Sequence, residues 1–116
     1  MESTITDTKG YAVIMINPHG SSGQGQKYQD AVRDDWGGVP FTDLMTGLDF
    51  AINKYTWLDG NKSCAVGASY GGYMVNWIQG QTDRFKCLVT HDGVFSTLTM
   101  SMRQKNFGSQ WPSIAL

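Results

Sequence analysis

The sequence predicts an α/β fold in which parallel central strands are flanked by helices. Three short apolar runs alternate along the chain with two segments whose apolar residues recur at helical spacing. The order strand, helix, strand, helix, strand is typical of a parallel sheet, because parallel strands need a crossover connection. The chain has 116 residues, fewer than the roughly 200–250 that large single α/β domains use. We therefore expect residues 1–116 to be a fragment of one such domain.

The first predicted strand is the apolar run Tyr11–Ile16, bounded by Gly10 and Asn17-Pro18. A short continuous run between turn residues is typical of a strand buried on both faces of a parallel sheet. A loop rich in glycine and serine, residues 20–25, follows it. Such a loop can bind phosphate, but its spacing is not Gly-x-Gly-x-x-Gly and no Gly-Lys-Ser/Thr follows. Nucleotide binding is therefore the weaker interpretation of this segment.

The first helix is predicted to begin at Pro40, because the missing N–H of proline costs little in a first turn. Asp43 is expected in that turn, where a negative charge suits the helix dipole. The apolar residues recur three and four positions apart and form one face, made of Phe41, Leu44, Met45, Leu48, Ala51 and Ile52.

The second strand is expected near residues 62–66, after a polar loop. A second helix is then predicted to begin near Tyr70. The apolar residues at helical spacing along it are Met74, Trp77 and Ile78.

The third strand is predicted over residues 85–90, and residues 91–93 form the loop that leaves its carboxyl end. Residues 1–9 are polar, and residues 101–116 show no clear periodicity. We assign neither segment to an element.

The segment between the second strand and the second helix, Gly67-Ala68-Ser69-Tyr70-Gly71, has the form Gly-x-Ser-x-Gly. A serine at a sharp strand-to-helix turn is exposed at the carboxyl edge of the sheet, where a substrate carbonyl can reach it. The turn is tight, so the residues on either side of it must be small, and Gly67 and Gly71 satisfy this requirement. The backbone N–H of Tyr70 then faces the developing oxyanion. This context predicts a nucleophile elbow with Ser69 as the nucleophile, and hence an α/β-hydrolase fold.

Composition argues against several other classes of protein. The net charge of −1 offers no bulk attraction for nucleic acid, and no apolar run is long enough to span a bilayer. The polar residues 1–9 show no signal peptide.

The two cysteines, Cys64 and Cys87, both lie in apolar runs. Buried free thiols are the favoured interpretation, and a disulfide between them is the alternative. Neither has the spacing or neighbours of a metal ligand, so we expect no metal and no cofactor.

Several segments together resemble the prolyl oligopeptidase family of serine peptidases, and within it the dipeptidyl-peptidase 5 branch. Residues 67–74 are similar to the family's active-serine segment, and Asn17–Gly23 to its Asn-x-x-Gly-Ser loop. Residues 35–38 and 85–95 are similar as well. The resemblance covers residues 10–100, leaving 1–9 and 101–116 unplaced.

The resemblance implies a peptidase that cleaves peptide substrates through an acyl-enzyme on Ser69. It implies as well that parts of the domain and a β-propeller lie outside this chain. Gln24 stands where the family usually has an aromatic residue, often Tyr, and is a doubtful second oxyanion donor. The branch is secreted, so Asn61 in Asn61-Lys62-Ser63 is a possible glycosylation site; a cytoplasmic protein is the alternative.

The chain departs from this family where the catalytic base should be. In α/β-hydrolases the acid and then the histidine follow the serine, and in this family both lie well downstream of it. The only histidines are His19 and His91, and neither matches the family's catalytic position. Asp92 follows the strand after which some lipases place their acid, but this family does not use that position.

We therefore expect the isolated chain to have little or no peptidase activity. Two alternatives remain open. One is a non-catalytic truncated product that acts as an interaction module through an exposed apolar sheet face. The other is an acylaminoacyl peptidase or an esterase of the same fold.

Overall fold

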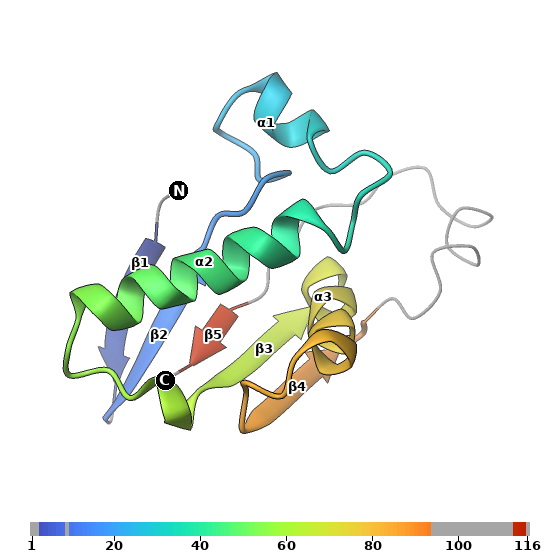
Figure 1. Ribbon diagram of the computed structural model, residues 1–116. Helices are drawn as coiled ribbons and strands as arrows, with labels where there is room; N and C mark the ends of the chain where they lie inside the picture. Colours follow the sequence, from blue (N-terminus) through green and yellow to red (C-terminus); the bar gives the residue numbers. More distant parts are fainter. Residues whose placement is uncertain (1–2, 9, 94–112, 116) are drawn as a thin grey trace.

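The computed structural model describes the backbone of residues 3–8, 10–93 and 113–115, and side chains within residues 10–93. The strands are β1 (Ser3–Thr8), β2 (Tyr11–Ile16), β3 (Cys64–Ala68), β4 (Cys87–His91) and β5 (Ser113–Ala115). The helices are α1 (Gln26–Asp30), α2 (Val39–Lys54), α3 (Tyr70–Gln81) and the short 3₁₀ turn η1 (Gly60–Lys62). Figure 1 shows α2 and α3 packed against the sheet.

The five strands form one sheet in the order β1-β2-β5-β3-β4. β3 and β4 are parallel, as the sequence predicts, but β5 is antiparallel to both β2 and β3. β2 and β3 therefore run in the same direction with one strand between them, and their carboxyl ends lie at the same edge of the sheet. The α/β class with flanking helices is confirmed, although the sheet is mixed.

The prediction that Tyr11–Ile16 is buried on both faces is wrong. Burial alternates along β2, because Ala12, Ile14 and Ile16 are buried whereas Tyr11 is 66% exposed. An alternating strand has one covered and one open face. The register places Ile14 of β2 in one row with Ala65 of β3, and both are fully buried.

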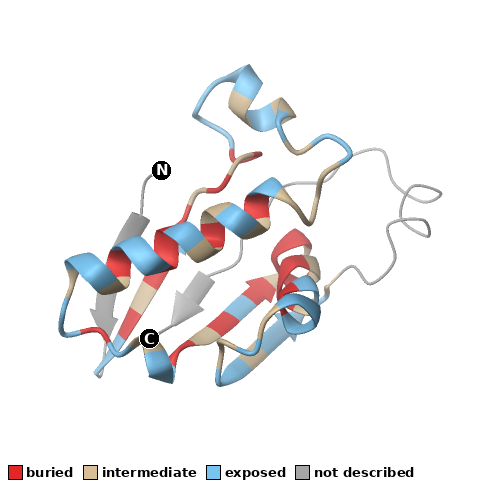
Figure 2. Cartoon of the chain, viewed as in Figure 1, coloured by how far each residue is buried: buried red, intermediate tan, exposed pale blue. Residues whose placement is uncertain are grey.

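The covered face of the sheet carries the core, since α2 packs on β2 and α3 packs on β3 and β4. On α2 the predicted face is confirmed, because Leu44, Leu48 and Ala51 are buried and the other three predicted residues pack against them. On α3, Met74 and Ile78 are buried as predicted, but Trp77 is 39% exposed. Figure 2 shows the buried residues along the inner sides of these elements.

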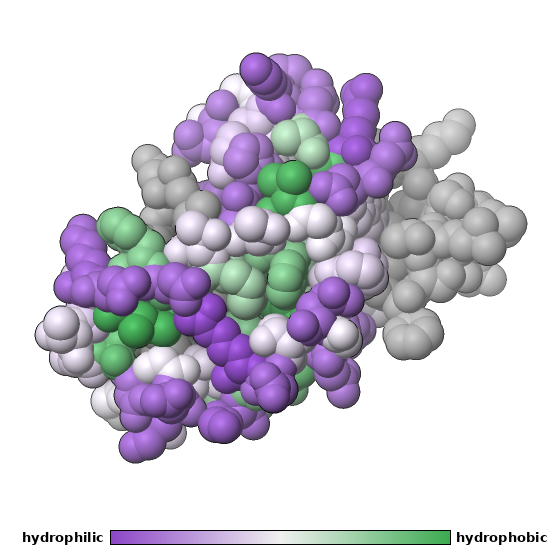
Figure 3. Space-filling view, in the orientation of Figure 1, coloured by the Kyte–Doolittle hydropathy of each residue, from purple (hydrophilic) through white to green (hydrophobic). Residues whose placement is uncertain are grey.

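The helix side of the molecule is largely hydrophilic at its surface, with separate hydrophobic patches (Figure 3).

The structure also corrects several element boundaries. Asp43 lies beyond the first turn of α2, because the helix begins one residue before Pro40. β3 begins two residues later than predicted, and α1 was not predicted. In the N-terminal stretch left unassigned above, residues 3–8 form β1, which pairs with β2.

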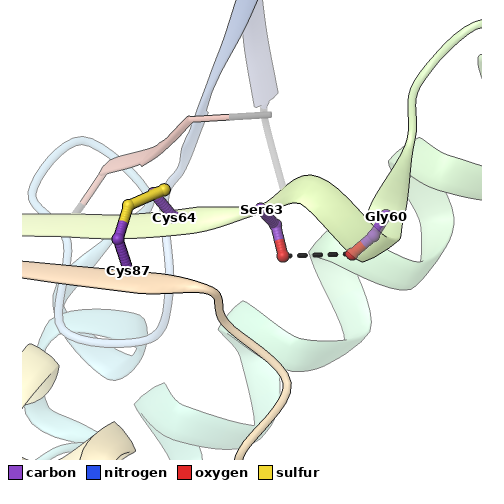
Figure 4. Close-up of a disulfide and its surroundings, with 4 residues drawn as sticks. All are labelled: Gly60, Ser63, Cys64 and Cys87. Carbon is purple, nitrogen blue, oxygen red and sulfur yellow. Dashed lines mark hydrogen bonds between the residues drawn. A yellow bond between two sulfur atoms is a disulfide. The ribbon is translucent and has the colours of Figure 1, made fainter.

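Cys64 and Cys87 form a disulfide, so the favoured interpretation as buried free thiols is wrong. The two residues are direct partners in the parallel pairing of β3 and β4 (Figure 4). Cys87 is exposed and Cys64 is half-buried. Apolar neighbours in the sequence suggested burial, but both residues lie on the sheet face that the helices leave uncovered.

Candidate active site

Ser69 lies between the end of β3 and the start of α3, as the elbow motif predicts. Its φ is 56° and its ψ is −117°, a conformation that residues with a Cβ rarely adopt. Two backbone hydrogen bonds hold it there. Its N–H donates to the His91 carbonyl at 3.0 Å, and its carbonyl accepts from the Tyr73 N–H at 3.1 Å. The end of β4 and the first turn of α3 thus fix the serine.

The glycines of this segment are required by close backbone contacts. A Cβ on Gly67 would lie 2.2 Å from the carbonyl oxygen of Gly71. A Cβ on Gly72 would lie 2.5 Å from the Cα of Gly93, beyond the end of β4. The absence of these side chains lets α3 start directly against the strands, which is the geometry that an elbow needs.

The strain at Ser69 leads to a prediction on stability. Because glycine tolerates a positive φ, Ser69→Gly should be more stable to denaturant than Ser69→Ala by about 1 kcal/mol, as both variants lack the hydroxyl. Urea unfolding of the two variants measures the difference. An alanine variant as stable as the glycine variant would show that the Ser69 backbone is relaxed.

Tyr70 begins α3 and anchors its first turn. Its side chain is buried, and its hydroxyl donates to the Trp36 carbonyl at 2.8 Å. The Trp36 ring meets the Tyr70 ring edge-on, and the Tyr73 ring lies tilted against it. Burial, then the nearby Tyr73 and Asp35, raise the pKa of Tyr70 well above its ordinary value. The hydroxyl therefore stays neutral and remains a hydrogen-bond donor.

A cleft of about 500 Å³ lies beside this aromatic group, lined by residues 34–38 together with Tyr73 and Trp77. Ser69 does not line it. Burial and Asp35 raise the pKa of Tyr73. No local pattern in the sequence indicates this cleft, because its walls come from two segments that lie far apart along the chain.

His19 lies at the carboxyl end of β2 and is bound to Asp43 of α2. The backbone N–H of His19 donates to Asp43 Oδ2 at 2.7 Å, and its ring Nδ1 lies 2.6 Å from the same oxygen. The ring stacks on Tyr28 at 4.1 Å between centroids, and burial and then Asp43 raise the pKa of Tyr28. His19 thus holds the loop in place, and the expectation that it is not a base stays a prediction.

Gln24 is exposed on the loop between β2 and α1. In the described part of the chain no hydrogen bond joins it to Ser69, so its role as an oxyanion donor stays a prediction.

Sequence reasoning missed the pairing of His19 with Asp43, since 24 residues separate the two and no local pattern links them.

His91 is the last residue of β4, and Asp92 follows it with a φ of 47°. Both side chains are exposed, and His91 Nδ1 lies 3.2 Å from Asp92 Oδ2. The contact between His91 and Ser69 is made by backbone atoms. Within residues 10–93, the Ser69 hydroxyl has no hydrogen bond to either histidine. Among the described residues, the structure thus presents Ser69 in an elbow with no histidine hydrogen-bonded to its hydroxyl.

Among the described residues, no group of His, Cys, Asp or Glu side chains could hold a metal ion. In the same ranges, no helix combines the length and apolar character of a membrane span.

Comparison with known proteins agrees with this geometry. The profile of the prolyl oligopeptidase family matches residues 1–115. Dipeptidyl-peptidase 5 of Schizosaccharomyces pombe is 47% identical over 91 residues, which is 77% of this chain and 13% of that protein. Dipeptidyl-peptidase 5 of Aspergillus oryzae is 47% identical over 89 residues, 75% of this chain and 12% of that protein.

A protein of Bacillus subtilis named uncharacterized peptidase YuxL is 46% identical over 93 residues, 80% of this chain and 14% of that protein. The chain thus spans between 12% and 14% of the length of these three relatives. The family profile also includes residues 1–9 and most of 101–116, which the resemblance had left unplaced. The chain belongs to the prolyl oligopeptidase family of serine peptidases.

Proposed function

We propose that this chain is the nucleophile-bearing part of a dipeptidyl-peptidase 5-like enzyme that hydrolyses peptides through an acyl-enzyme on Ser69. The observation that carries the proposal is the strained Ser69 between β3 and α3, at the carboxyl edge of the sheet. Family membership and the names of the relatives support peptides as the substrate class.

Each residue of the elbow has a role in this proposal. Ser69 Oγ attacks the peptide carbonyl, and its proton passes to a histidine supplied by the longer protein. Tyr70 contributes its backbone N–H to the oxyanion, since it opens α3, where the peptide dipoles favour negative charge. Gln24 is a second, weaker candidate donor. Water then releases the acyl group and restores Ser69.

The isolated chain should be nearly inactive, because neither His19 nor His91 is bonded to the Ser69 hydroxyl. In such enzymes loss of triad members leaves only a small residual rate. The longer protein would supply the acid and the base, as well as the remaining sheet and the propeller.

A fluorophosphonate probe followed by intact-mass measurement tests this expectation. We expect no rapid labelling of the isolated chain, and none of the Ser69→Ala control. Rapid, stoichiometric labelling of Ser69 would contradict it, and the variants His19→Ala and His91→Ala would then identify the base. In a longer protein, comparing dipeptide-releasing with acylamino and ester substrates separates a dipeptidyl-peptidase from an acylaminoacyl peptidase or an esterase.

A second candidate function is that of an interaction module. The sheet face that the helices leave open exposes large apolar side chains, namely Tyr11, Met15, Val66 and Val89. Exposed apolar surface of this kind marks contact sites or promotes aggregation. Sedimentation of the isolated chain tests the idea: a monomer at all concentrations, with no partner bound, would argue against it.

We further propose that the protein is secreted, in line with fungal relatives named dipeptidyl-peptidase 5, with a cytoplasmic protein as the alternative. Asn61 is exposed on η1, where a glycan could be carried. The protein secreted from a eukaryotic host should carry the additional mass of a glycan, and the Asn61→Gln variant should lack this mass. A secreted chain with unchanged mass would show that the sequon is not used.

A further inference from the structure

The Cys64–Cys87 disulfide lies on the open face of the sheet. Cys64 and Cys87 occupy the same row as Val13 of β2, through Ala115 of β5. The neighbouring row on this face contains Met15, Val66 and Val89, all of them exposed. Because α2 and α3 pack on the other face, the disulfide is accessible to a small molecule.

The two cysteines differ in exposure. Cys87 is exposed on β4, whereas Cys64 is half-buried on β3. β4 is the last strand of the sheet and pairs on one side only, and β3 lies between β4 and β5. An incoming thiolate therefore reaches Cys87 Sγ more readily than Cys64 Sγ.

The disulfide also links the two strands that hold the nucleophile. The pairing that begins with Cys64 and Cys87 ends with Ala68 and His91, and the His91 carbonyl accepts from the Ser69 N–H at 3.0 Å. β4 has five residues and pairs with β3 alone among the described strands, so the disulfide adds to this pairing and to the packing of α3 in fixing its register. The disulfide is the covalent link in the described part of the chain that secures it.

From this arrangement we propose that Cys64–Cys87 is a thiol-exchange site for small thiols of the glutathione class, and that its state controls the order of the elbow. The thiolate attacks Cys87 Sγ and forms a mixed disulfide there, while the S–S electron pair goes to Cys64, which takes up a proton. A second thiol can then attack the mixed disulfide, releasing oxidised thiol and a Cys87 thiol. Two electrons and two protons are transferred in total.

The site of reaction is tested on the native oxidised chain with an excess of reduced glutathione. We expect intact mass to show one glutathione, peptide mapping to place it on Cys87, and Cys64 to become open to alkylation. The Cys87→Ser variant should lose that adduct. The proposal would be overturned if the chain prepared under oxidising conditions still had two free thiols. It would also be overturned if glutathione formed an adduct only after unfolding, or formed its adduct on Cys64.

The coupling to the elbow is tested by hydrogen exchange of the wild-type chain in its oxidised and reduced states, which needs no variant to fold. We expect the peptide spanning residues 64–74 to exchange several-fold faster when reduced, while the buried middle of α2 stays unchanged. Equal exchange in the two states would overturn the coupling, and faster exchange everywhere would show general unfolding instead. Neither readout depends on peptidase activity, so the result is independent of the proposed function.

Discussion

Gly67→Ala is expected to destabilise the chain by more than about 4 kcal/mol, which is exceptional for a single substitution. The added Cβ would lie 2.2 Å from the Gly71 carbonyl oxygen and 2.4 Å from its carbonyl carbon. Backbone atoms of the first turn of α3 cannot move away without displacing the helix from β3 and β4. The methyl group thus forces the elbow apart, and urea unfolding followed by circular dichroism should show a transition at much lower denaturant.

Gly80→Ala is the matched control for that experiment. Gly80 is exposed near the end of the same helix, and a Cβ there would meet no atom within 4 Å. The same change should leave stability unchanged or raise it by up to about 1 kcal/mol, because alanine is the better helix former. If Gly67→Ala were as stable as Gly80→Ala, the close approach of β3 and α3 would be absent in solution.

The features predicted correctly from the sequence are those set by neighbouring residues. The elbow is one: a strand, a serine between glycines and a helix follow one another within a few positions, and the structure has them in that order. The apolar face of α2 is another, because its residues recur at the helical period. Both follow from local periodicity and turn geometry.

The features that sequence reasoning missed depend on contacts between distant segments. β5 separates β2 from β3, and no pattern in the sequence could show an antiparallel strand there. The burial of Tyr11–Ile16 on both faces was predicted wrongly for the same reason, because a continuous apolar run does not reveal whether a second layer covers it. That error carried over to the cysteines, whose exposure follows from the uncovered face of the sheet.

Met74→Ala is expected to cost about 2–5 kcal/mol of stability, as for other large-to-small changes in a core. Met74 is fully buried, one turn into α3, and belongs to the core cluster shared with α2 and the sheet. Its removal leaves a cavity beneath the first turns of the helix. Because Ser69 and Tyr70 stand at the start of α3, the loss also weakens the support of the nucleophile.

Gln79→Ala is the control for Met74→Ala, since Gln79 is exposed on the same helix and alanine is a strong helix former. Its stability should stay within about 0.5 kcal/mol of the unchanged chain. Equal losses for the two variants would mean that α3 does not pack on β3 and β4 in the isolated chain. A large loss for Met74→Ala alone would instead show that this chain builds its own core beneath the elbow, so that its own residues position Ser69.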